Sequence, residues 1–115
     1  MSLTNGRFQS SNRLKRPEEF RKVFSSKLRS SDNSLLLIAR KNGTDNTRLG
    51  LAVPKKHIQQ SVKRNRIKRL IRESFRLNKD QLQGLDIVVV IKQDIKNDQL
   101  EFKKKLKQHW DKISK

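Results

Sequence analysis

Cysteine and tyrosine are absent from this chain of 115 residues, which also has only two prolines, four glycines and few acidic residues. Without cysteine, neither a disulfide framework nor a thiolate metal site can form. The only histidines are His57 and His109, and the 11 Asp and Glu residues show no grouping with the spacing of a nuclease metal site. The sequence therefore predicts neither catalytic residues nor a metal site of its own.

Long apolar runs are absent as well. No segment approaches the roughly 18 apolar residues of a membrane-spanning helix, and residues 1–12 lack the apolar stretch of a signal peptide. We therefore expect a cytoplasmic protein. Leu, Ile, Val and Phe still make up 33 of the 115 residues, more than the roughly 20% below which a highly charged chain is expected to be disordered. We expect a flexible tail at residues 1–12 and one domain at residues 13–115.

Negative charge is scarce, because 29 Lys and Arg residues stand against 11 Asp and Glu residues and give a formal net charge of +18. Such an imbalance destabilises a compact chain by self-repulsion unless a polyanion binds to it. Nucleic acid is the usual polyanion. An anionic membrane surface is the competing partner, but neither end of the chain carries a lipidation signature. Composition thus favours a nucleic-acid-binding protein.

The charge is most concentrated in residues 63–76, which hold seven cationic side chains and one acid. A helix advances about 100° per residue, so this segment has an apolar stripe that faces a core and a polar arc opposite to it. Ser61 is the expected N-cap. The pattern predicts a helix that offers cations to a polyphosphate. The stripe consists of Ile67, Leu70, Ile71 and Ser74, and the arc consists of Asn65, Lys68, Arg69, Arg72 and Arg76.

An earlier helix is predicted at residues 17–25. Pro17 and the two acids that follow it are typical of the first turn of a helix, and Phe20, Val23 and Phe24 fall on one face. Residues 25–33 are polar and are predicted to form a connection.

Three apolar runs predict strands, at residues 35–38, 48–53 and 85–91. In the second run Gly50 and Ala52 point to one face, which leaves room for a helix or another group to lie close to the sheet.

A last helix is predicted to begin at a capping box formed by Asp98 and Glu101. Its apolar stripe consists of Phe102, Leu106, Trp110 and Ile113, so Trp110 belongs to the core, and His109 is predicted to face solvent. The order helix-strand-strand-helix-strand-helix, with room for a further short strand, predicts an α+β fold, a single-domain α/β sandwich around one mixed sheet.

The segment from Ser61 to Arg72, SVKRNRIKRLIR, resembles the signature helix of the bacterial ribonuclease P protein subunit. That family has a small residue, two variable positions and then Arg-Asn-Arg-hydrophobic-Lys-Arg-x-hydrophobic-Arg. The resemblance extends over about residues 12 to 112, through RLK at Arg13, LGLAV at Leu49 and DIVVV at Asp86. It implies a ribosomal-protein-like fold with a left-handed βαβ crossover. The family usually has Ala where this chain has Ser61.

The resemblance implies a ribonucleoprotein in which a catalytic RNA removes the 5′ leader of precursor tRNA. The partners are then the ribonuclease P RNA and precursor tRNA, and the Mg²⁺ cofactor is held by the RNA. Two RNA surfaces follow from the same resemblance. The residues expected to contact the catalytic RNA are Lys55, Lys56, Lys63, Arg64, Asn65, Arg66, Lys68, Arg69 and Arg72. Those expected to contact the leader are Arg13, Lys15, Arg16, Phe20, Phe24, Leu36 and Ile38.

Aromatic side chains suit a single-stranded leader, because unstacked bases lie on them while cations follow the backbone. From spacing alone, however, Phe20 and Phe24 also fit a role in packing their helix on the sheet.

Three other functions fit part of the pattern. A ribosomal or other structural RNA-binding protein has a similar charge and size, but does not need a Phe-lined cleft. A protein-only nuclease lacks its acidic site here. A DNA-binding protein that reads a groove with the basic helix has only Asn65 for adenine-type contacts, and no dimerisation element is evident.

Overall fold

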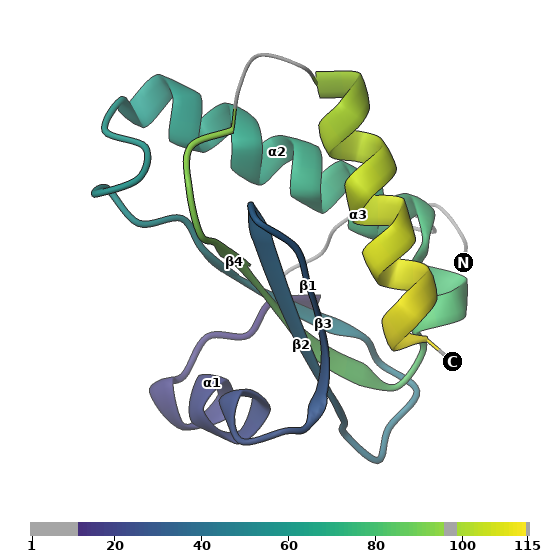
Figure 1. Cartoon of the computed structure of the whole chain (residues 1–115). Coiled ribbons are helices and arrows are strands. Elements are labelled where there is room, and N and C mark those ends of the chain that lie inside the picture. Colours follow the sequence, from purple (N-terminus) through teal and green to yellow (C-terminus); the bar gives the residue numbers. More distant parts are fainter. Residues whose placement is uncertain (1–11, 96–98, 115) are drawn as a thin grey trace, which may run out of the picture.

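The computed structural model describes residues 12–95 and 99–114, which form three α-helices and one four-stranded sheet (Figure 1). The strand order is β1-β2-β4-β3, in which β1 pairs antiparallel with β2, β2 pairs antiparallel with β4, and β3 pairs parallel with β4. In chain order the elements are α1 (Pro17–Phe24), β1 (Leu28–Ser31), β2 (Leu35–Lys41), β3 (Arg48–Ala52), α2 (Ser61–Leu77), a 3₁₀ turn (Lys79–Leu82), β4 (Leu85–Ile91) and α3 (Gln99–Ile113).

The α+β class, the single mixed sheet and the predicted helices and strands are confirmed. Strand β1 is the short element that the sequence could not place, and it lies inside residues 25–33, which were predicted to be a connection. It has one apolar residue, Leu28, and forms only because it pairs with the edge of β2. Helix α2 connects the parallel neighbours β3 and β4, and the hand of that crossover stays a prediction.

One detail of the helix ends differs from expectation. The N-cap of α2 is Gln60 rather than Ser61, which is already the first helical residue. Asp98, the expected cap of α3, lies outside the described residues. So do residues 1–11 of the expected tail. Its last residue, Asn12, belongs to the fold, because it is 3% exposed and its amide donates a hydrogen bond of 2.8 Å to the Thr47 carbonyl.

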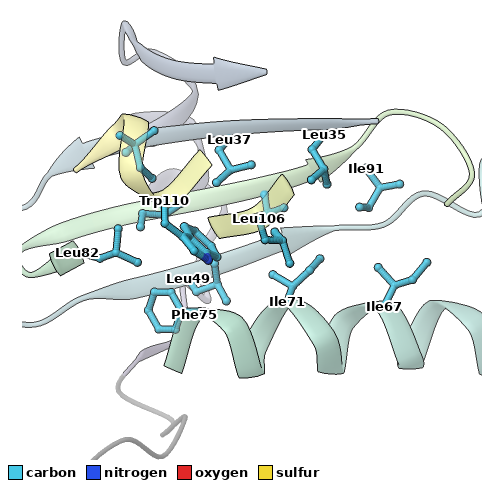
Figure 2. Packing of buried hydrophobic residues seen from close by; sticks show 14 of the residues in the cluster. Leu35, Leu37, Leu49, Ile67, Ile71, Phe75, Leu82, Ile91, Leu106 and Trp110 are labelled. Carbon is cyan, nitrogen blue, oxygen red and sulfur yellow. The ribbon is translucent and has the colours of Figure 1, made fainter. Parts of the chain in front are cut away.

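The larger core lies between the sheet and the pair α2 and α3. Figure 2 shows Ile67, Ile71 and Phe75 pointing from α2 toward the sheet, and all three are buried. Trp110 of α3 is fully buried, as predicted, and meets Phe75 edge-on at a ring-centroid distance of 6.1 Å. Its indole N–H donates to Ser74 Oγ over 2.8 Å, so the one polar residue of the predicted stripe serves a buried donor.

Helix α1 covers the opposite face of the sheet, alone among the described helices (Figure 1). Its Val23 is fully buried against Ile38 of β2 and Val88 of β4. Phe20 is half-buried on the same cluster. The Phe20 ring lies against Gly50 of β3, and a Cβ built there would stand 2.5 Å from Phe20 Cε1 and 2.7 Å from Phe20 Cζ. The expectation that Gly50 leaves room for a close neighbour is confirmed.

The prediction that His109 faces solvent is wrong. The residue is 3% exposed, with Nδ1 2.6 Å from Ser30 Oγ and Nε2 2.8 Å from Asp32 Oδ2. Burial acts to raise the pKa of Asp32, but hydrogen bonds to His109 and to the backbone N–H groups of Leu35 and Ser34 outweigh it and lower that pKa. His109 therefore packs against the β1–β2 hairpin, whose first strand the sequence had not placed.

Candidate nucleic-acid interface

Helix α2 presents a cationic face, as its periodicity predicts. Asn65, Arg66 and Arg69 are exposed, while Lys68 and Arg72 are half-buried. The first turn of the helix has no acidic residue, so nothing in that turn screens the positive end of the helix dipole. The exposed cations of α2 are therefore placed to meet an anionic partner.

Two cations of the same motif have structural contacts. Arg64 Nη1 donates to the carbonyls of Ile58 and Gln59, over 3.0 and 2.8 Å, and so holds the loop that precedes α2. Lys63 Nζ lies 2.7 Å from Asp94 Oδ1, in the segment after β4. Both side chains are half-buried. Spacing gave no sign of these contacts, because their partners lie on other segments.

Lys55 and Lys56 are exposed in the turn between β3 and α2. The backbone N–H groups of His57 and Ile58 both donate to the Pro54 carbonyl over 3.1 Å, which closes that turn. Ile58 is buried in the larger core. The backbone of the two lysines is thus held in a closed turn that precedes α2.

The aromatic residues of α1 differ in exposure. Phe24 is 40% exposed, and Phe20 is half-buried over Gly50. Leu36 is half-buried at the edge of the same cluster, whereas Ile38 is 0% exposed and packs inside it. Arg13, Lys15 and Arg16, which precede α1, are exposed.

An ion-pair network that the sequence did not predict fixes α1 on the sheet. Arg48 of β3 donates to both carboxylate oxygens of Asp86, from Nε over 2.8 Å and from Nη2 over 2.7 Å, and from Nη1 to Glu19 Oε2 over 2.6 Å. Asp86 is 2% exposed. The hydrogen bonds that Arg48 donates to Asp86 raise the pKa of Arg48, although burial opposes them. The one sequence signal was an acid at the start of an apolar strand.

The other oxygen of Glu19 caps the start of α1. Glu19 Oε1 accepts hydrogen bonds from the backbone N–H groups of Lys15 and Arg16, over 2.8 and 2.9 Å. These two bonds, together with Arg48, lower the pKa of Glu19 to about 2. A single carboxylate therefore connects the first turn of α1, the segment before it and the sheet.

A hollow of about 210 Å³ lies at the β3 edge of the sheet and joins the two predicted surfaces. Arg13 and Phe20, expected on one RNA surface, line it together with Lys68 and Arg72, expected on the other. Burial, and then the nearby charge of Arg13, lowers the pKa of Arg72.

Comparison with known proteins agrees with this geometry. Residues 8–114 match the ribonuclease P protein family. The chain is 43% identical over 110 residues to the ribonuclease P protein component of Pseudomonas putida, covering 92% of this chain and 78% of the relative. It is 53% identical over 83 residues to that of Methylococcus capsulatus, covering 72% of this chain and 65% of the relative.

Solved structures give the same result. An RNase P protein mutant of Staphylococcus aureus with defective mRNA degradation activity superimposes with a TM-score of 0.79 at 27% identity, covering 96% of this chain and 91% of that one. The RNase P protein of Thermotoga maritima gives a TM-score of 0.63 at 33% identity, covering 88% and 90%.

The chain belongs to the ribonuclease P protein family.

In this ribonuclease P protein the family match includes every helix and strand described above. Within residues 12–95 and 99–114, no group of three or more His, Cys, Asp or Glu side chains could hold a metal ion. Over the same residues, no helix is both long enough and apolar enough to cross a membrane.

Proposed function

We propose that this ribonuclease P protein binds a catalytic RNA through the cationic face of α2 and the 5′ leader of precursor tRNA beside α1. The RNA would hold Mg²⁺ and cleave the precursor to give the mature 5′ end of the tRNA. The observation that carries this proposal is the adjacency of the two surfaces. Lys68 and Arg72, half-buried cations of α2, and Phe20 of α1 lie beside the same edge strand, β3.

The chemistry of the two surfaces fits different forms of RNA. Cations such as Arg66 and Arg69 contact phosphates, which supply affinity and a steep dependence on salt. Phe24 and the half-buried Phe20 offer ring surface to unstacked bases, at about 1–3 kcal/mol per base. A protein that only neutralises phosphates needs the first surface and not the second.

The proposal is tested by incubating precursor tRNA with the protein alone, with a bacterial ribonuclease P RNA alone, and with both. We expect no cleavage by the protein alone. Stimulation of the RNA should be largest at low Mg²⁺, because the protein cations replace part of the screening that Mg²⁺ provides between two RNAs. Cleavage by RNA-free protein, persisting in the presence of inhibitors of contaminating nucleases, contradicts the proposal.

A structural RNA-binding protein is the second candidate, and the charge of α2 alone fits it equally well. The same assay distinguishes the two, because such a protein would bind the RNA without any stimulation that depends on the leader. Precursor and mature tRNA should then bind to the RNA–protein complex with equal affinity.

A further inference from the structure

Five lysines lie in α3, which packs on the sheet face opposite α1 (Figure 1). The apolar stripe of this helix is buried in the larger core, so the lysines lie on the sides of the helix that the core does not use. None of them was expected to contact RNA. They are Lys103, Lys104, Lys105, Lys107 and Lys112, and the acids of the same helix are Glu101 and Asp111.

Two of these lysines have a role within the fold. Lys112 lies in the last turn of α3, where the helix dipole favours a cation. Lys107 Nζ lies 2.9 Å from Asp111 Oδ1 and donates a hydrogen bond to Asn78 Oδ1 over 3.1 Å. The fold therefore accounts for Lys107 and Lys112 by itself.

Lys103 and Lys104 have no such role. Both are exposed, and neither side chain forms a hydrogen bond or an ion pair with another residue in the described part of the chain. Lys107 follows them at i+4 and i+3, and like charges at these spacings destabilise a helix. Two adjacent lysines that repel their neighbours and have no ion-pair partner in the fold indicate a surface that meets a polyanion.

These two lysines lie beside the cationic face of α2. Hydrogen bonds from Arg76 lower the pKa of Glu73, although burial opposes them, and the positive charge of Lys103 adds to the lowering, so Lys103 lies close to α2. Arg76 holds Glu73 through both carboxylate oxygens. Near the N-terminal ends of both helices, Arg66 of α2 and Phe102 of α3 line one hollow of about 140 Å³. The cations of α2 and α3 are thus neighbours on one side of the molecule.

The chemistry of this surface fits the backbone of a duplex. The aromatic residues of α3, Phe102 and Trp110, are buried, so the helix offers no ring on which an unstacked base could lie. A lysine ammonium is a point charge that contacts phosphates without reading bases. Packed helices lie about 8–10 Å apart, so cations on α2 and α3 form two rows, and a base-paired stem presents two strands of phosphates. Double-stranded RNA is recognised mainly through its backbone and shape.

The position of α3 decides which RNA it meets. The aromatic face of α1, proposed for the leader, lies on the other face of the sheet (Figure 1), whereas α3 packs beside α2. We propose that Lys103 and Lys104 bind backbone phosphates in a base-paired stem of the catalytic RNA, next to the segment that α2 contacts. The inference rests on the proposed function and deepens it, since α3 becomes a second contact of the protein with the same RNA.

The test compares Lys103→Gln/Lys104→Gln with a control variant that removes the same charge, Arg21→Gln/Lys22→Gln. Arg21 and Lys22 are exposed cations of α1, on the opposite face of the sheet. Glutamine is about as good a helix former as lysine, so thermal melts of both variants should match the wild type. Affinity for the full-length ribonuclease P RNA is measured against salt for each protein, and hydroxyl-radical footprinting of the RNA locates the riboses that each protein protects.

The log–log salt slope of the Lys103/Lys104 variant should be smaller than that of the wild type by about 1.8, because each duplex phosphate contributes about 0.9. Between about 50 and 200 mM salt, the wild type should therefore lose about tenfold more affinity than this variant. The variant should also lose protection of a base-paired segment of the RNA. The control variant should keep the wild-type slope and footprint.

Three outcomes overturn the inference. A wild-type salt slope of the Lys103/Lys104 variant excludes phosphate contacts at these lysines. Equal losses in the two variants reflect net charge alone. Lost protection in single-stranded segments, or unchanged RNA binding with weaker binding of mature tRNA to the RNA–protein complex or of polyglutamate to the free protein, assigns the surface to a different partner.

Failure of this test is distinct from failure of the proposed function. Both variants keep the cations of α2 and the aromatic residues of α1, so a wild-type result for the Lys103/Lys104 variant leaves the cleavage test standing. Failure of the wild-type protein itself to bind the RNA contradicts the proposed function instead.

Discussion

Replacing Gly50 with alanine should displace Phe20 and separate leader binding from general RNA binding. The added Cβ would lie 2.5 Å from Phe20 Cε1, 2.7 Å from Phe20 Cζ and 3.2 Å from Leu14 Cδ1. Carbon atoms in contact are normally about 3.5–4.0 Å apart, so the ring must move by roughly 1 Å or more. The ring is the free end of the Phe20 side chain and one side of it faces the hollow, so it has room to move.

The effect on stability should be modest because two terms oppose each other. Overpacking typically destabilises the fold by about 1–3 kcal/mol. Alanine in place of a mid-strand glycine stabilises it by about 0.5–1 kcal/mol, because alanine loses less backbone entropy on folding. We therefore expect the free energy of unfolding to fall by about 0–2.5 kcal/mol. If Phe20 stacks on a leader base, its displacement removes about 1–3 kcal/mol, which weakens precursor binding by about 5- to 150-fold. Mature tRNA should bind unchanged.

The assay is the affinity of the reconstituted RNA–protein complex for precursor and for mature tRNA, beside urea unfolding of the free protein. Leucine at position 20 reaches less far than phenylalanine, so Gly50→Ala should have little further effect in a Phe20→Leu background. Equal losses for both tRNAs, or a full effect of Gly50→Ala in the Phe20→Leu background, would refute the reasoning.

Four further outcomes are expected. Arg69→Glu should weaken binding to the ribonuclease P RNA and reduce the salt slope, with an unchanged circular-dichroism melt, because Arg69 is exposed; a collapsed melt contradicts this. Phe24→Ala should lower the free energy of unfolding by less than about 1 kcal/mol, since Phe24 is 40% exposed, and a larger loss in urea unfolding places it in the core. Glu19 has a folded-state pKa of about 2, below its usual 4.5, so its stabilisation is fully present above about pH 4.5 and is lost as pH falls toward 2. The melting temperature of Glu19→Gln should therefore be lower than that of the wild type at neutral pH, and the two melting temperatures should converge in acid. Trp110→Ala should cost about 3–5 kcal/mol in urea unfolding and leave Ser74 without its indole donor; a loss below about 1 kcal/mol contradicts a core role.

Local sequence patterns were sufficient to predict those helices and strands whose own residues show a clear apolar periodicity or a β-branched run. The basic helix, its apolar stripe and the strand at Leu85–Ile91 follow from periodicity and β-branched residues. Strand β1 carries almost no apolar signal, and pairing with β2 alone makes it a strand. His109 was misplaced for a similar reason, because periodicity identifies the apolar face of a helix but does not show that a hairpin covers part of its polar face.

The sequence by itself determined the composition of the proposed RNA-binding surfaces: a net charge of +18, one helix with its cations on one face, a second helix with two aromatic residues on one face, and acids without the spacing of a metal site. Only the tertiary structure decided which of those residues meet. Arg13 and Arg72 line the same hollow because the segment before α1 is hydrogen-bonded to β3, and α2 is the next helix after β3 in the chain. Arg48 reaches both Glu19 and Asp86 because the parallel pairing places Arg48 opposite Asp86. Spacing along the chain reports neighbours within one helix or strand, whereas contacts between elements depend on sheet order and register, which long-range pairing sets.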